Sequence, residues 1–520
     1  MRRLLLLLLL FSFSLLPTAC QDGSREGAAS KDTAAKGNVP LPEPGQLEEL
    51  AAQSDPQGGA PGVPDVNPED AAMEPVEAGG TGSELAQGGE GPDVPTLDGS
   101  SRFPKPEAVR GIYLNAWTAG SPSRRGRLID LARRTEVNAF VIDIKDATGY
   151  LSHASRVPLA REVGATDEIR IRDLPGLLTQ LEEAGIYPIA RIVVSKDPLL
   201  SGGRPDLAIQ DSAGGAWVDQ KDVMWLNFHN PEVWDYHLDI AIEVAEAGFP
   251  EIQWDYVRFP DAPEDVLSRA VFPGSNGRSR ADAVREFLGH TRKALSARGV
   301  ALTADVFGVT TSYRNDVGIG QLWESFIDQV DVALPMVYPS HYFTRSYGYD
   351  KPNAYPYEIV RQALRDAVRR SSLVDGAGAT RPWLQDFSLG EPIYGSPEVR
   401  AQIQATYDAG IQEWILWNPG SRYTEAALMP AGGVPFWLEP VMRVGGEVVA
   451  ISRRFEILGE EDPTGGEAPV DSTFLDVDLA RPHRLPGTNA LPVVPIPDTA
   501  KASLSVVIPD TTAARSTPRP

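Results

Sequence analysis

Eight short apolar segments recur between residues 111 and 418, and longer stretches with helical periodicity separate them. They lie at 111–117, 138–146, 186–194, 251–259, 300–308, 330–338, 381–389 and 411–418. Strands that alternate with helices pair in parallel, so the pattern predicts an α/β fold, a (β/α)8 TIM barrel over residues 103–430. A doubly wound open sheet is the alternative. It usually has fewer strands, and the first strand–helix turn here lacks GxGxxG.

The N-terminus has the order of a secretory signal, which we assign to residues 1–20. Two arginines precede an apolar run from Leu4 to Leu16, and small residues lead to Cys20. The run is shorter than the roughly 20 residues of a membrane span. Cys20 is the only cysteine, and its position resembles the lipidation site of bacterial lipoproteins. We therefore expect an extracytoplasmic, membrane-anchored lipoprotein, periplasmic or at the cell surface. The alternative is a cleaved signal without lipid.

The segments flanking the barrel have a different composition. Residues 21–100 are rich in Gly, Ala, Pro and Glu, and carry a net charge of −13 out of −23 for the chain. Such a stretch buries too little apolar surface to offset the entropy of ordering, so we expect a disordered acidic linker. We expect residues 431–458 to pack on the barrel as a short extension and residues 459–520 to form a disordered tail. The negative charge argues against nucleic acid as a partner.

Alternation along the strands predicts which side chains enter the barrel. In EIQWDYVRF, the bulky residues Ile252 and Trp254 share one face, so Asp255 points inward near the carboxyl end of the fourth strand. Active sites of such barrels are built at that end. The same alternation turns Asp305 inward on the fifth strand. Because neighbouring strands lie about 5 Å apart, the two carboxyls should raise the pKa of one of them. We expect both to be catalytic.

Other polar and aromatic residues are expected near the same strand ends, where they would contact substrate. They are Tyr113, Asn115, Asp143, Lys145, Arg191, Arg258, Tyr338, Asp386, Trp417 and Asn418. Aromatic faces stack on sugar rings, and polar neighbours bind the hydroxyls. The structural alternatives are that Arg191 or Lys145 neutralises Asp143, and that Asp305 anchors a loop. The long segment 195–235 either walls a groove, with Trp217 and Trp225 as contacts, or forms a small core of its own.

Two inward carboxyls on adjacent strands are the equipment of a glycoside hydrolase, one as acid and one as nucleophile or base. The six histidines form no HExxH motif, the lone cysteine lies outside the barrel, and no GxSxG motif or P-loop occurs. We therefore expect no metal and no cofactor. A non-catalytic glycan-binding lipoprotein is the second hypothesis. A phosphate-ester hydrolase is the third. Such an enzyme would want more inward cations than the three predicted ones, Lys145, Arg191 and Arg258, although three are not negligible.

Six motifs in order resemble a bacterial family of glycoside hydrolase domains over about residues 109–430. They are VRGIYLNAW, NAFVIDIKDATG, YPIARIVVSKDPLL, EIQWDYVRFP, LTADVFG and ALPMVYPSHY. The family resembles sugar-cleaving TIM barrels such as the alpha-amylase relatives. That resemblance implies that Asp255 is the nucleophile, Asp305 the acid/base and Asp386 a third acid. The chain departs from those relatives at Asp305, where they have a glutamate, one methylene longer.

Overall fold

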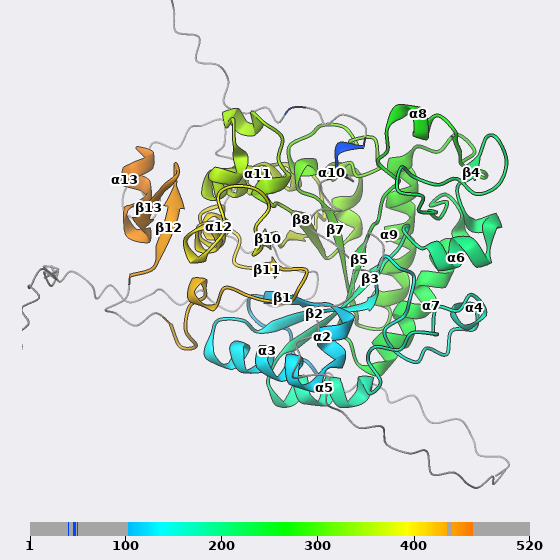
Figure 1. Ribbon diagram of the computed structural model, residues 1–520, viewed down its shortest axis with the longest axis horizontal. Coiled ribbons are helices and arrows are strands. Elements are labelled where there is room, and N and C mark those ends of the chain that lie inside the picture. Colours follow the sequence, from blue (N-terminus) through cyan, green and yellow to red (C-terminus); the bar gives the residue numbers. More distant parts are fainter. Residues whose placement is uncertain (1–39, 41–44, 48, 50–101, 434–438, 461–520) are drawn as a thin grey trace, which may run out of the picture.

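The computed structural model describes residues 40, 45–47, 49, 102–433 and 439–460. Within them, eight parallel strands close into a barrel surrounded by helices (Figure 1), which confirms the (β/α)8 prediction. The barrel strands are β1 (Arg110–Leu114), β2 (Ala139–Lys145), β3 (Tyr187–Val193), β5 (Glu251–Asp255), β7 (Ala301–Phe307), β8 (Val332–Met336), β10 (Trp383–Gln385) and β11 (Trp414–Trp417). β5 and β7 are therefore the fourth and fifth strands of the barrel.

The ring closes between β8 and β10. Met336 and Trp383 are the one pair of Cα partners between these strands in the described chain. At the amino end of β8, the neighbouring strand is instead β9 (Ala379–Thr380), which pairs with Val332 and Ala333. The closure is therefore short compared with the ladders between the other barrel strands.

The helices occupy the stretches with 3.6-residue periodicity, and several begin and end at residues suited to those positions. Asn230 caps α7, Pro231 is its first residue, and Gly248 with φ of 120° follows its end. The helices are α2 (Ala116–Gly120), α3 (Pro122–Arg134), α4 (Pro158–Glu162), α5 (Leu174–Glu183), α6 (Pro198–Gly203), α7 (Pro231–Ala247), α8 (Glu264–Leu267), α9 (Arg280–Ser296), α10 (Trp323–Phe326), α11 (Pro356–Ser371), α12 (Ser396–Asp408) and α13 (Arg454–Leu458). Short 3₁₀ turns include η4 (Gly308–Thr311) after β7 and η6 (Pro339–His341) after β8.

The two faces of β5 divide as the alternation predicts. Trp254 of β5 packs outward against Phe287 of α9, with ring centroids 5.3 Å apart. Inside the barrel, at the amino end of the strands, Arg381 is fully buried and pairs with Glu251 at 2.6 Å and Glu413 at 2.8 Å. This ion cluster fills the end of the barrel opposite the predicted site.

The long segment after β3 forms a small core of its own. Trp217 and Trp225 are completely buried there, together with Val193, Ile209 and Tyr256. A two-stranded antiparallel sheet, β4 (Gln210–Asp211) with β6 (Ala270–Val271), lies at its edge. The packed alternative for residues 195–235 therefore describes the two tryptophans.

Residues 439–460 add a hairpin and a short helix beside the barrel. β12 (Val441–Val444) and β13 (Glu447–Ala450) pair antiparallel, and β12 lies against α12. Arg443 pairs with Glu398 of α12. Among the described residues, no helix is long and apolar enough to cross a membrane. Cys20, most of the predicted linker and all of the predicted tail except Gly459 and Glu460 lie outside the described residues.

Candidate active site

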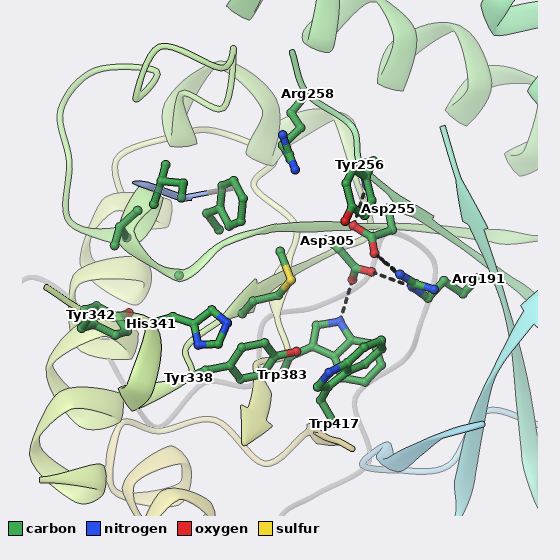
Figure 2. A pocket seen from close by; sticks show the side chains of 15 residues that line it. Arg191, Asp255, Tyr256, Arg258, Asp305, Tyr338, His341, Tyr342, Trp383 and Trp417 are labelled. Carbon is green, nitrogen blue, oxygen red and sulfur yellow. Dashed lines mark hydrogen bonds and ion pairs between the residues drawn. The ribbon is translucent and has the colours of Figure 1, made fainter. Parts of the chain in front are cut away.

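The two predicted catalytic carboxyls lie on neighbouring strands at the carboxyl end of the barrel. Asp255 is the last residue of β5, and Asp305 lies two residues before the end of β7. The ladder between these strands pairs Trp254 with Ala304, so Asp255 and Asp305 are the next residues along each strand. Both side chains face the interior and line one pocket (Figure 2).

Arg191 of β3 holds this part of the site together. Its Nε lies 3.0 Å from Oδ2 of Asp255 and 3.9 Å from Oδ2 of Asp305. Its Nη1 donates to Oδ1 of Asp143, its cross-strand partner on β2. One guanidinium therefore contacts three buried carboxyls, so the cluster carries fewer cations than acids. The prediction that Arg191 neutralises Asp143 describes part of this arrangement.

Asp305 is the more enclosed of the two predicted catalytic carboxyls. It is only 1% exposed, and its Oδ1 accepts hydrogen bonds from Trp383 Nε1 at 2.7 Å and Gln253 Nε2 at 2.9 Å. Burial, with a smaller contribution from the charge of Asp255, raises the pKa of Asp305 well above its usual range. The protonated form of Asp305 is therefore favoured relative to that of an ordinary aspartate.

Asp143 is a second carboxyl with a raised pKa. Burial raises its pKa to about 7, although Arg191 and the hydroxyl of Tyr113 favour its charged form. Asp143 is not among the residues that line the pocket, and its contacts are with Arg191 and Tyr113. It is placed to orient Arg191 from behind.

Aromatic side chains form one wall of the pocket. Trp417 stacks on Tyr113 with centroids 4.1 Å apart and meets Trp383 nearly at right angles. In Figure 2, Tyr338 lies beside Trp383, and His341 lies next to Tyr338 on the same side of the pocket. The pocket holds about 700 Å³ of space, including the part open to solvent.

Tyr256, directly after Asp255, has a left-handed backbone with φ of 52°. A tyrosine rarely adopts this conformation, and such strain concentrates at functional sites. The turn brings the Tyr256 N–H to 2.6 Å from Oδ1 of Asp255, while Ser195 Oγ donates to the Tyr256 carbonyl. Arg191 and this N–H together fix both oxygens of Asp255.

Arg258 follows on the same turn and lines the pocket. Its guanidinium lies 4.6 Å from the ring centroid of Tyr256, 4.8 Å from that of Phe307 and 5.0 Å from that of Trp225. The aromatic rings hold this cation at the pocket rim.

The part of the chain that forms the barrel and its pocket also matches a known protein family. A family model described as "Putative glycosyl hydrolase domain" matches residues 111–423, more than half of the sequence. The chain belongs to this family. The match spans all eight barrel strands apart from the first residue of β1, and includes each carboxyl described above.

Solved structures also resemble this glycosyl hydrolase domain. A hypothetical protein from Ruminiclostridium thermocellum ATCC 27405 is 39% identical over 38% of this chain and 97% of its own, with a TM-score of 0.35. The PgaB (BpsB) glycoside hydrolase domain from Bordetella bronchiseptica is 15% identical over 60% of this chain and 95% of its own, with a TM-score of 0.43. A chitobiase from Flavobacterium johnsoniae is 14% identical over 60% and 46%, with a TM-score of 0.39. A search of the curated proteins found no match. Since these TM-scores are below 0.5, no chemistry is transferred from those proteins.

Tyr113 and Asp143 contact the lining residues Trp417 and Arg191 without lining the pocket themselves. Four further residues predicted to contact substrate also lie away from the pocket lining of the glycosyl hydrolase domain. Lys145 is fully buried and pairs with Asp197 at 2.8 Å. The physical reason is a register shift between Asp143 and Lys145, which places Lys145 beside Ile192 and reverses its face. Its contacts are those of a structural ion pair.

The other three lie beyond the ends of their strands and stabilise turns. The side chain of Asn115 caps α2 and donates to the Pro419 carbonyl. Asn418 Oδ1 accepts from the Gly420 N–H at 2.9 Å. Asp386 accepts from the N–H and the hydroxyl of Thr424, and burial raises its pKa to about 6. Strand alternation does not extend into these turns, which is why the prediction placed them inward.

Two residues that contact Asp305 were not among the predicted site residues. Trp383 and Gln253 both donate to its carboxyl. Gln253 has the same parity as Asp255, so the alternation places it inward without indicating a partner. Trp383 has the parity of Gln385, and only the closure of the barrel brings it to β7.

Proposed function

We propose that this domain is a glycoside hydrolase that cleaves an extracytoplasmic polysaccharide or glycan. The observation that carries the proposal is the pair Asp255 and Asp305, two carboxyls on adjacent strands that share Arg191 at the wall of an aromatic pocket. The aromatic wall suits sugar rings, and the signal-like N-terminus supports an extracytoplasmic location.

In the proposed reaction, Asp255 attacks the anomeric carbon. Arg191 and the Tyr256 N–H hold its two oxygens, so the carboxylate is oriented before substrate binds. Asp305 donates its proton to the leaving oxygen, and its raised pKa favours the protonated form that this step needs. Afterwards Asp305 takes a proton from the water that releases the sugar.

The spacing of the carboxyls favours retention of configuration. One oxygen of Asp255 and one of Asp305 both lie within 3.9 Å of Arg191 Nε. These two oxygens are therefore less than about 7 Å apart, which allows the roughly 5–5.5 Å of retaining enzymes and lies below most of the roughly 6.5–9.5 Å range of inverting ones.

We expect the protein to release reducing ends from a member of a polysaccharide panel. NMR of the first-formed product should show the same anomer as the bond that was cleaved. An inverted product would contradict Asp255 as nucleophile, and the absence of release across the panel would contradict hydrolysis itself.

The activity is expected to fall as pH rises, because Asp305 works in its protonated form. Its raised folded-state pKa favours that form, and activity is lost as pH rises through that pKa. Asp305→Asn should lower kcat/KM on the glycan by about 10²- to 10⁴-fold and remove the alkaline limb. The measurement is a pH profile of kcat/KM.

Two comparisons identify the group behind this limb. An aryl glycoside with a 4-nitrophenolate leaving group needs no proton, so it should restore much of the lost rate in Asp305→Asn but not in Asp255→Asn. Asp143→Asn should keep the limb. If the limb disappears in Asp143→Asn instead, the titration belongs to Asp143, whose pKa is about 7.

A further inference from the structure

A short segment far from the barrel in sequence lies in the pocket. Residues 45–47 and 49 form a single helical turn, in which the Glu49 N–H donates to the Gly45 carbonyl at 3.2 Å. Leu47 is 3% exposed and lines the same pocket as Asp255 and Asp305. Figure 1 shows this blue segment against the green loops at the carboxyl end of the barrel. These residues fall within the stretch 21–100 that composition predicts to be a linker.

A buried carboxylate of the barrel holds the segment in place. Asp261 Oδ1 accepts from the Gly45 N–H at 2.9 Å, and Oδ2 accepts from the Leu47 N–H at 2.8 Å. Asp261 is 7% exposed and lies six residues after Asp255 on the same loop. The loop that follows Asp255, the proposed nucleophile, therefore also binds residues 45–47.

Gly45 shows that the contact is close. Its φ is 92°, a conformation suited to glycine, and a Cβ at this position would lie 3.0 Å from Cδ of Pro263. A side chain here would push the backbone away from the rim. The segment thus matches the barrel surface at its backbone as well as at Leu47.

The pocket offers Leu47 an apolar environment. Phe307, Val309 and Met336 line the same space. A stretch rich in Gly, Pro and Glu does not bury apolar side chains by itself. The burial of Leu47 therefore depends on the barrel, and the segment is ordered by docking.

We propose that residues 45–47 form an intramolecular plug that competes with substrate for the pocket. That the competing substrate is a glycan rests on the proposed function. Leu47 borders the space that both carboxyls line, so a glycan that fills this space and extends past Leu47 meets the plug, which leaves to make room. Substrate then binds the fraction of molecules whose plug has left, which raises the apparent KM by the inverse of that fraction.

Two variants in the full-length chain open the pocket from opposite sides. Asp261→Asn keeps the size of the anchor but leaves one acceptor oxygen for two N–H donors. Leu47→Asp changes the plug itself and leaves every barrel residue intact. The matched control is Asp265→Asn, an exposed aspartate four residues after Asp261 on α8.

Docking is measured first without any substrate. Hydrogen exchange should show protected amides at Gly45 and Leu47 in the wild type, and exchange about tenfold faster in Asp261→Asn. Hydroxyl-radical footprinting of Trp417 and Met336 should show greater oxidation in both variants and no change in Asp265→Asn. Unprotected amides in the wild type, or unchanged footprints in both variants, would overturn the plug.

Kinetics then test the competition. With the glycan identified by the panel, KM should fall about tenfold in both variants while kcat stays unchanged. A KM equal to that of the wild type in both variants would overturn competition while leaving hydrolysis standing. Failure of the proposed function is a different result, namely no turnover by any variant, and the exchange and footprinting outcomes do not depend on it.

Discussion

Asp255→Asn is expected to lower kcat/KM on the glycan by about 10³- to 10⁵-fold, because the amide cannot attack the anomeric carbon. The melting temperature should change little. The substituted amide would keep the size of the side chain and an oxygen for the Tyr256 N–H. Its NH2 would replace the oxygen that accepts from Arg191, and the lower repulsion in a cluster of three acids and one cation should offset that lost contact. The measurement pairs steady-state kinetics with calorimetry of the same preparation.

Asp331→Asn provides the matched control for this variant. Asp331 directly precedes β8, at the opposite end of the barrel, where it accepts from Arg292 and from the Leu302 N–H. Its loss should lower stability but leave kcat/KM within about twofold, since it touches nothing in the pocket. A large loss of stability in Asp255→Asn with activity retained would make Asp255 a structural carboxylate.

Arg191→Met is expected to cost about 3–5 kcal/mol of unfolding free energy, because it removes the cation shared by three buried carboxyls. Methionine fills similar space without charge. Without the cation, the negative charges of the three carboxyls would repel one another, and no ion pair would offset the cost of burying them. Turnover should fall as well, since Asp255 would lose the group that orients it. Chemical unfolding monitored by tryptophan fluorescence gives the free energy.

The loss in Arg191→Met should grow with pH. Asp143 and Asp305 already have folded-state pKa values above the usual value, so the folded state binds more protons than the unfolded state above about pH 4. Stability then falls as pH rises toward those raised values, and losing the cation steepens the fall. Arg191→Lys should restore only part, because an ammonium lacks the planar fork that reaches Asp143 and Asp255 together. Equal stabilities of Arg191→Met and wild type at pH 8 would contradict this account.

The barrel and its two inward acids were predictable because both depend on local patterns. Apolar runs of strand length, separated by amphipathic helices, identify the eight strands. The two-residue period of a strand then turns Asp255 and Asp305 to one side. The same rule fails at Lys145, where a register shift reverses the face, and at Asp386, which lies just past the end of β10.

Contacts between distant segments were not predictable in this way. Trp383 reaches Asp305 only because the barrel closes, and the alternation of residues along β10 does not predict this contact. Leu47 is harder still, since its neighbours in sequence are those of a linker and its anchor at Asp261 lies 214 residues away. Such contacts depend on the finished surface of the barrel rather than on the segment itself.

The short ladder between β8 and β10 links the rigidity of the barrel to the occupancy of its pocket. Met336 and Trp383, the pair that joins these strands, both line the pocket. A ligand or a chain segment in the pocket therefore contacts both β8 and β10, the two strands joined by the shortest ladder of the barrel. Such contacts add to the interactions that hold these two strands together. When the pocket is emptied, these added contacts are lost, so the stability of the closed barrel depends on what occupies its pocket.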